Sequence, residues 1–255
     1  MMPPKFNAII LCAFVFVIGL FGVPLMSQDK GKEQFSKSEI ELIKKLALDA
    51  LLENPEVLRE ASRILQAREE QIRNDKVSNL IREYSSELTD AKDTVIIGNQ
   101  SGDITIVEFF DYNCPYCKTA AKELQALIKA DGNIKFIPRE WPILNTNSVI
   151  AAKAALAAVA QGKYKEFHWD LMKEGSLTES KIFDIAENLG INISSLKEDM
   201  ESEFVINHIA KTTALARRIG FSGTPLFIIE GKFLPGYVPL AELEKLISDI
   251  RKSRM

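Results

Sequence analysis

Apolar residues follow a helical pattern from Ser36 to about residue 88. They recur at intervals of three and four, as on one face of a helix: Ile40, Ile43, Leu46, Ala47, Ala50, Leu51, Val57, Leu58, Ala61, Ile64, Leu65, Ile72, Val77, Leu80, Ile81, Tyr84 and Leu88. Ser36 with Glu39 forms a capping box. Asn54 interrupts the pattern, and Pro55 is suited to the first position of a new helix. The pattern therefore predicts amphipathic helices ahead of the first strand.

The pattern then changes to that of strands. A short strand is expected over residues 94–97, followed by a polar turn. Residues 104–112 (ITIVEFFDY) are nearly all apolar, which is typical of a buried central strand. A helix over 114–130 and a strand over 134–137 complete a strand–helix–strand unit.

The rest of the chain is helical until a final hairpin. Helices are predicted over 148–161, 164–173, 178–189 and, with breaks, 194–219. Two short strands, 226–229 and 232–234, flank a tight turn at Glu230-Gly231. A helix over 240–250 closes an α/β domain that carries a helical insert at about 146–219.

The N-terminal residues have the pattern of an export signal. Lys5 precedes an uncharged run, 6–28, that is apolar over 8–23. That run is short for a membrane span, which needs about 20 apolar residues. We expect residues 1–26 to be a signal peptide, or an anchor if uncleaved, and the rest to be exported with Lys5 on the cytoplasmic side. The expected domains are a helical extension over 27–92 and an α/β domain over 93–255.

The composition of the chain argues against two kinds of function and leaves one pair of candidate reactive residues. The formal net charge of −3 argues against nucleic-acid binding, and two histidines make a His-rich metal site unexpected. Of three cysteines, Cys12 lies inside the apolar run. The exported part holds only Cys114 and Cys117, spaced C-x-x-C, and a pair of this kind can form a disulfide in an oxidising compartment.

The setting of this pair predicts redox chemistry. Cys114 would lie where a buried strand gives way to a helix, facing free backbone N–H groups and the positive end of the helix dipole. Both favour the thiolate, so the pKa of Cys114 should fall. Cys117, one turn further, would be more buried and able to resolve a mixed disulfide. A zinc half-site and a structural clip are the alternatives, but further zinc ligands are missing and so short a loop adds little stability.

Glu108 precedes Cys114 by six residues in the apolar strand. Burial should raise its pKa. The alternative is a solvated glutamate at a strand edge.

The segments FFDYNCPYCKTAAKEL and GTPLFIIEGKFLPGY, with the helical insert between them, resemble the DsbA-like branch of the thioredoxin superfamily. The resemblance covers about residues 94–255 and implies a thioredoxin fold. It implies that Cys114 attacks, that Cys117 resolves, and that Glu108 handles the proton of the buried cysteine.

The resemblance also assigns residues around the dithiol. It places a cis-proline at Pro225, preceded by Thr224, where an extended substrate peptide would bind; an ordinary trans proline is the alternative. Pro115 and Tyr116 would tune the redox potential. Strongly oxidising members often carry His where this chain has Tyr116.

DsbA-like relatives with a comparable extension use it as a stalk or dimerisation arm, which favours a homo-oligomeric isomerase or reductase. A helix pair folded against its own domain is the structural alternative. The functional alternatives are a monomeric dithiol oxidase and a chaperone or metal-binding module that uses its thiols incidentally. We expect exported protein substrates, a membrane redox partner, a periplasmic location, and no cofactor besides the dithiol.

Overall fold

The computed structural model describes residues 35–89 and 95–255. The expected signal segment, 1–26, lies outside the described residues. Internal packing divides the chain into two compact units, Met1–Ala61 and Ser62–Met255. No helix within the described ranges has both the length and the apolar character needed to cross a bilayer.

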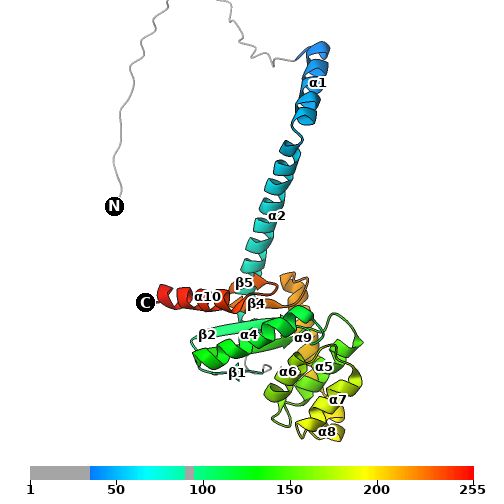
Figure 1. Ribbon diagram of the computed structural model, residues 1–255, viewed down its shortest axis with the longest axis vertical. Coiled ribbons are helices and arrows are strands. Elements are labelled where there is room, and N and C mark those ends of the chain that lie inside the picture. Colours follow the sequence, from blue (N-terminus) through cyan, green and yellow to red (C-terminus); the bar gives the residue numbers. More distant parts are fainter. Residues whose placement is uncertain (1–34, 90–94) are drawn as a thin grey trace, which may run out of the picture. The chain divides into compact units, whose positions relative to one another are not determined.

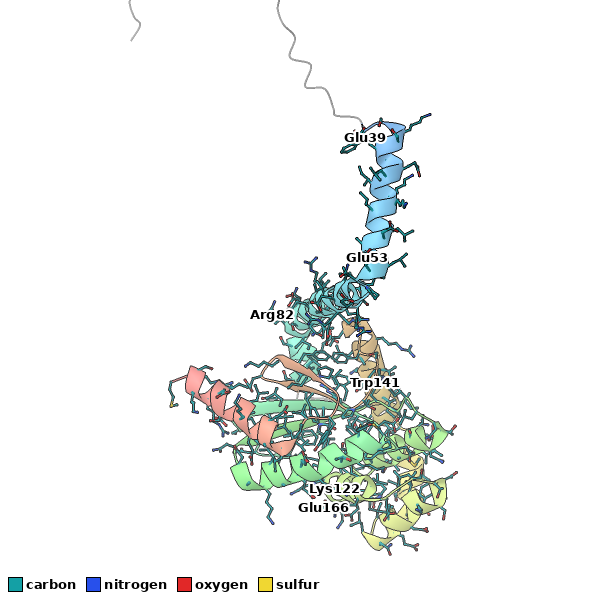
Figure 2. All side chains as sticks on the ribbon, turned by 45° about the horizontal axis from the view of Figure 1, so that its top comes forward. Glu39, Glu53, Arg82, Lys122, Trp141 and Glu166 are labelled. Atoms are coloured by element: carbon teal, nitrogen blue, oxygen red, sulfur yellow. The ribbon has the colours of Figure 1, made fainter. Side chains whose placement is uncertain are left out.

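The described part of the first unit is helical, as predicted. Helix α1 (Lys37–Glu53) begins with the expected capping box: Ser36 Oγ accepts a hydrogen bond from the Glu39 N–H, and the Glu39 carboxylate accepts one from the Ser36 N–H. The helix ends at Asn54, and α2 (Glu56–Glu83) follows. No residue of α1 is buried, and its side chains stand out around the helix between Glu39 and Glu53 (Figure 2).

A five-stranded mixed sheet forms the centre of the second unit (Figure 1). Its strands are β1 (Ile97–Gly98), β2 (Ile104–Phe110), β3 (Ile134–Glu140), β4 (Leu226–Ile229) and β5 (Lys232–Pro235). Their order is β1-β3-β2-β4-β5; β2 and β3 are parallel, and all other neighbours are antiparallel. As predicted, β2 is the buried central strand.

The first strand is shorter than expected and lies later in the chain. We predicted it over 94–97, whereas β1 pairs with β3 only at Ile97 and Gly98, and residues 90–94 are not described. Gly98 has a φ of +88°, and a Cβ at this position would lie 2.5 Å from the Ile134 carbonyl oxygen. The close approach of the two backbones therefore requires glycine.

Alternate residues of β2 face two different hydrophobic clusters, as the pleat of a strand dictates. Ile104, Ile106 and Phe110 pack in a cluster with α4 (Pro115–Asp131) and α10 (Leu240–Ser253). Val107 and Phe109 pack in a second cluster.

The second cluster is completed by helices from two distant parts of the chain. It includes Val77 and Ile81 from α2 and Leu88 from α3 (Ser85–Thr89). It also includes Leu215 and Ile219 from α9 (Glu203–Ile219). The end of the helical extension is thus part of the core that covers the sheet.

The insert consists of short helices packed beside the sheet (Figure 1). They are α5 (Thr146–Ala157), α6 (Tyr164–Lys173), α7 (Glu179–Asn188), α8 (Ile193–Asp199) and α9. The predicted segment 194–219 is divided between α8 and α9, because the Ser202 side chain caps a new helix. Many insert side chains, among them Leu156, Phe167 and Leu196, belong to the same cluster as α4, so insert and sheet share one core.

Candidate active site

Cys114 lies where β2 gives way to helix α4. It is the N-cap residue of α4, and Pro115 takes the first helical position, where its missing N–H costs no hydrogen bond. The Cys114 N–H donates to the Asp111 carbonyl oxygen at 3.0 Å. The Asp111 carboxylate accepts hydrogen bonds from the N–H groups of Asn113, Ile143 and Leu144 at 2.7, 2.8 and 3.0 Å. This carboxylate therefore holds two loops together beneath the cysteine.

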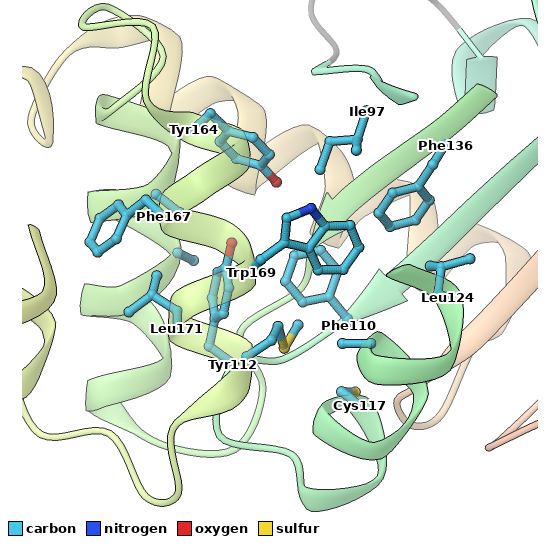
Figure 3. Close-up of a cluster of buried hydrophobic side chains, with 14 of the residues drawn as sticks. Ile97, Phe110, Tyr112, Cys117, Leu124, Phe136, Tyr164, Phe167, Trp169 and Leu171 are labelled. Carbon is cyan, nitrogen blue, oxygen red and sulfur yellow. The ribbon is translucent and has the colours of Figure 1, made fainter. Parts of the chain in front are cut away.

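The two cysteines are free thiols with different surroundings. Cys114 is 5% exposed and Cys117 is 0% exposed, while Tyr116 between them is 66% exposed. Cys117 borders a cluster of buried side chains that includes Phe110 and Leu124 (Figure 3). A reagent in solvent can therefore reach Cys114 but not Cys117.

The surroundings of the two sulfurs shift their pKa values in opposite directions. A hydrogen bond from the Cys117 thiol is the largest influence on Cys114. Together with backbone N–H groups of Cys117 and Tyr116 it lowers the pKa of Cys114 to about 5, against the opposing effect of burial. Burial is the main cause that raises the pKa of Cys117 above its ordinary value. Cys114 is thus a thiolate at neutral pH, and Cys117 is a thiol.

Glu108 lies on β2 between Pro138 of β3 and Phe227 of β4. Its side chain is 1% exposed, and its Oε1 atom has no hydrogen-bond partner among the described residues. Burial first, and the charge of Cys114 second, raise the pKa of Glu108 well above its ordinary value. The alternative of a solvated strand edge is wrong for this residue.

Thr224 and Pro225 lie beside Cys114, and the peptide bond between them is cis, as predicted. Cys114 Sγ lies 3.4 Å from the Thr224 carbonyl oxygen, to which the sulfur donates only in its protonated form. The Pro225 carbonyl oxygen accepts from the Gly236 N–H at 2.9 Å. Within the described ranges, the Thr224 N–H donates to no protein group. The loop therefore presents one unpaired backbone donor next to the reactive sulfur.

Lys118, directly after Cys117, is a site residue that the sequence reasoning missed. Its Nζ donates to the Leu171 carbonyl oxygen at 3.1 Å. Burial is the main cause that lowers the pKa of Lys118 to about 8. Its place one turn after the helix start, on the side of the cysteines, was the available signal.

A buried polar network behind the dithiol was also missed. The Tyr112 hydroxyl is 2.9 Å from His168 Nδ1, and the Tyr164 hydroxyl donates to the Glu140 carboxylate. His208 Nε2 lies 3.1 Å from the same carboxylate. In Figure 3, the hydroxyl groups of Tyr112 and Tyr164 point toward each other. The contacts of His168 with the rings of Phe110 and Tyr164 indicate a packing role for this residue.

No group of three or more His, Cys, Asp or Glu side chains in the described part of the chain is placed to hold a metal ion. The chemistry available at this site is that of two thiols, one ionised and one protonated, with a carboxyl group below them.

Together, the sheet, the helical insert and the paired thiols define a DsbA-like thioredoxin fold that carries a C-x-x-C pair at the start of a helix. The chain belongs to the DsbA-like thioredoxin domain family, whose model matches residues 105–248. Residues 41–71 match the model of the copper resistance protein ScsC N-terminal domain. The comparisons confirm both the predicted family and the predicted fold class, an α/β thioredoxin fold with a helical insert and a helical extension.

Solved structures resemble most of the chain. A thioredoxin-like oxidoreductase from Silicibacter pomeroyi DSS-3 is 45% identical with a TM-score of 0.63, covering 66% of this chain and 97% of its own. The thiol–disulfide exchange protein alpha-DsbA2 from Wolbachia pipientis is 30% identical with a TM-score of 0.65, covering 70% of this chain and 98% of its own.

A curated relative, a Na(+)/H(+) antiporter NhaA 1 of Salinispora arenicola, is 30% identical over 139 residues. The match covers 53% of this chain and 21% of that protein, so the chain spans about a fifth of the length of the first curated relatives it matches.

Proposed function

We propose that the protein is an exported enzyme that isomerises or reduces disulfides of secreted or periplasmic proteins through Cys114 and Cys117, as a homo-oligomer. The observation that carries this proposal is the contrast between the two sulfurs. One is a slightly exposed thiolate at a helix start, and the other is a fully buried thiol one turn away. A low thiol pKa makes a sulfur both an available nucleophile and a good leaving group.

Reduction of a substrate proceeds in two exchanges. The Cys114 thiolate attacks one sulfur of a substrate disulfide, and the other substrate sulfur leaves as a thiolate that takes a proton from water. Cys117 gives its proton to the Glu108 carboxylate and attacks Cys114 Sγ. The second substrate sulfur leaves as a thiolate that also takes a proton from water, and Glu108 afterwards returns its proton to the solvent. The protein now holds a Cys114–Cys117 disulfide, and the substrate has gained two electrons and two protons.

Isomerisation uses the first exchange alone. A different thiolate of the same substrate attacks the mixed disulfide at Cys114 and forms a new substrate disulfide, so the dithiol is regenerated with no net redox change. In both reactions the Thr224–Pro225 loop holds the substrate backbone, Pro115 and Tyr116 tune the potential, and no bound cofactor takes part.

Cysteine variants test this function. Cys114→Ser should abolish exchange with a scrambled, disulfide-bonded substrate, because the only accessible thiolate of the pair is lost. Cys117→Ser should accumulate a protein–substrate mixed disulfide, which a gel without reductant resolves. Full exchange activity in Cys114→Ser would refute the proposal.

The exposed apolar surface of α1 supports self-association. This helix buries no residue, yet it carries large apolar side chains that are more than a third exposed: Ile40, Leu42, Ile43, Leu46, Leu48, Leu51 and Leu52. An apolar surface of this kind is typical of an interaction site. The match of residues 41–71 to the ScsC N-terminal domain falls on the same helices.

Oligomeric mass tests the role of the extension. The wild type should have a mass that is a multiple of the chain's own, and the double variant Ile43→Lys/Leu46→Lys should be monomeric. Glu53→Lys, at an exposed polar position of the same helix, is the control and should keep the wild-type mass. The monomeric variant should still exchange with a small thiol but lose isomerase activity. A monomeric wild type would contradict the homo-oligomer.

One observation favours the alternative, a monomeric dithiol oxidase. The lowered pKa of Cys114 stabilises the reduced protein, which makes its disulfide more oxidising. The reduction potential, measured in a glutathione buffer, separates the two functions: a strongly oxidising value in a monomer would favour the oxidase. The proposal of export to the periplasm is based on Lys5 and the apolar run that follows it. A membrane redox partner is proposed because the dithiol must be returned to its starting redox state after each reaction.

A further inference from the structure

A cavity lies next to the dithiol, and helix α2 forms one of its walls. It has a volume of about 310 Å³, and all its lining residues belong to the compact unit Ser62–Met255. One wall is the face of α2 that carries Glu70, Arg73, Asn74 and Val77. The opposite wall is the loop 220–226 with residues of and after β5. We call this cavity the α2 groove.

The α2 groove is continuous with the substrate side of the active site. Thr224 and Pro225 line it, and the Thr224 carbonyl oxygen is the group 3.4 Å from Cys114 Sγ. The unpaired Thr224 N–H gives an extended peptide a backbone partner at the same place. A residue of an extended chain spans about 3.3 Å. A substrate segment that starts at Cys114 therefore reaches the groove within about three residues.

The floor of the groove is apolar and firmly packed. Val77 from the α2 wall and Phe221 and Leu226 from the opposite wall are at most 8% exposed, and these three residues are what we call the floor. The ring of Phe221 stacks on that of Phe233, with centroids 5.6 Å apart and an angle of 6° between the planes. This floor fits an apolar side chain of a bound peptide.

Of the two charged residues that line the groove, Arg73 is the nearer to Val77 along helix α2. It precedes the packed Val77 by four residues, about one helical turn, whereas Glu70 precedes it by seven, about two turns. Arg73 is exposed, and neither Arg73 nor Glu70 makes an ion pair or hydrogen bond within the ranges that the structure describes. The guanidinium of Arg73 is thus free to bind a carboxylate at the apolar floor. Glu70 lies about one helical turn further from Val77 than Arg73 does.

From this geometry we propose that the α2 groove binds the substrate segment beside the reactive cysteine, and that Arg73 selects segments with an acidic residue next to an apolar one. The proposal rests on the proposed function and deepens it by naming the substrate class: extended acidic–apolar segments within about three residues of a cysteine. It also gives the extension a role in substrate selection.

Exchange rates with matched peptides test the proposal in the full chain. Two cysteine peptides differ only in the residue beside a leucine, Asp in one and Lys in the other, and a third carries Asp with Ser in place of leucine. The oxidised wild type should react with the Asp–Leu peptide about three to ten times faster than with the Lys–Leu peptide. This ratio is expected when Arg73 forms an exposed ion pair with the Asp and repels the Lys. The Asp–Ser peptide should also be slower.

Arg73→Glu should invert the preference between the Asp and Lys peptides. Arg82→Glu is the matched control: it makes the same change on the same helix, nine residues on and about half a turn around, and it does not line the α2 groove. Arg82→Glu should keep the wild-type preference. Dithiothreitol, a small thiol without carboxylates or a peptide backbone, reports on the dithiol alone and should react with the wild type and with Arg82→Glu at the same rate.

The possible outcomes distinguish a failure of the α2 groove proposal from a failure of the proposed function. An unchanged preference between the Asp and Lys peptides in Arg73→Glu would overturn the proposal, while normal exchange of the wild type with dithiothreitol would leave the proposed function standing. An equal loss of rate toward dithiothreitol and all peptides in Arg73→Glu would show damage to the dithiol and would also overturn the proposed selection by Arg73. A change of oligomeric mass in Arg73→Glu, with no change of preference, would assign the groove to a second copy of the chain. Absence of exchange with any thiol in the wild type would refute the proposed function itself.

Discussion

At the residue scale, the ionisation of Cys114 sets the pH range of the chemistry. Its pKa falls from 9.0 to about 5, so the rate of Cys114 alkylation should be half-maximal near pH 5 and constant well above it. Because the folded-state pKa is depressed, the thiolate stabilises the reduced protein fully above pH 9, and this contribution is lost as the pH falls through 5.

Two measurements check this prediction: the ultraviolet absorbance of the thiolate against pH, and denaturant unfolding of the reduced and oxidised proteins. The unfolding free energy of the reduced protein minus that of the oxidised protein should become smaller as the pH falls from 9 to 5. An alkylation midpoint near the ordinary value of 9.0 would contradict it.

Glu108 should act on the second exchange and not on the first. Glu108→Gln keeps the shape of the buried side chain but removes the proton acceptor below Cys117, so resolution of the mixed disulfide should slow by about 10²-fold. Rapid-mixing kinetics with a thiol peptide would separate the two steps. Glu187→Gln, on the exposed surface of α7, is the control. Equal slowing of both steps in Glu108→Gln would argue against a role in proton transfer.

At the element scale, one buried acid adds a polar contact between the sheet and the insert. Glu140 ends β3, and the hydroxyl of Tyr164 on α6 donates to its carboxylate. Tyr164→Phe leaves this carboxylate without that donor, which should lower the free energy of unfolding by about 1–3 kcal/mol. Urea unfolding measures the change. Tyr116→Phe, at an exposed tyrosine, should have little effect, and a similar loss in both variants would exclude the specific role of Tyr164.

Elements with a strong local signal were predictable from the sequence, and contacts between elements were not. The run of apolar residues identified β2, and Ser36 with Glu39 marked the start of α1. Strand β1 was placed too early, because two paired residues leave almost no pattern.

The same difference between local signals and long-range contacts applies to the candidate active site. The pattern predicts Cys114 and Cys117 as the reactive pair, since a strand, the two cysteines and a helix are adjacent in sequence. The approach of Thr224 to Cys114 was known only by resemblance, because 110 residues separate them. The wall that Arg73 contributes to the α2 groove depends on packing across the whole unit and had no local signal.

At the scale of the whole molecule, the end of the extension should be required for stability. Val77, Ile81 and Leu88 are at most 5% exposed in the cluster on the sheet, and burial of each contributes about 1.5–3 kcal/mol. Arg139 also donates to the carbonyl oxygens of Glu87 and Leu88, at 2.7 and 2.9 Å. A chain truncated to 93–255 should therefore be less stable by about 4 kcal/mol or more, whereas one truncated to 62–255 should unfold like the full domain.

Chemical denaturation of the two truncated chains makes the comparison. Equal stability of 93–255 and 62–255 would show that the last turns of α2 and α3 are dispensable for the domain.

The unequal exposure of the two active-site sulfurs also makes the chain report on its own folding. A thiol-blocking reagent applied to the reduced native protein should attach at Cys114 and leave Cys117 untouched, whereas the unfolded chain should take a label at both. One additional label in a mass spectrum would then count the unfolded molecules in any sample, without a dye, an antibody or an enzymatic assay.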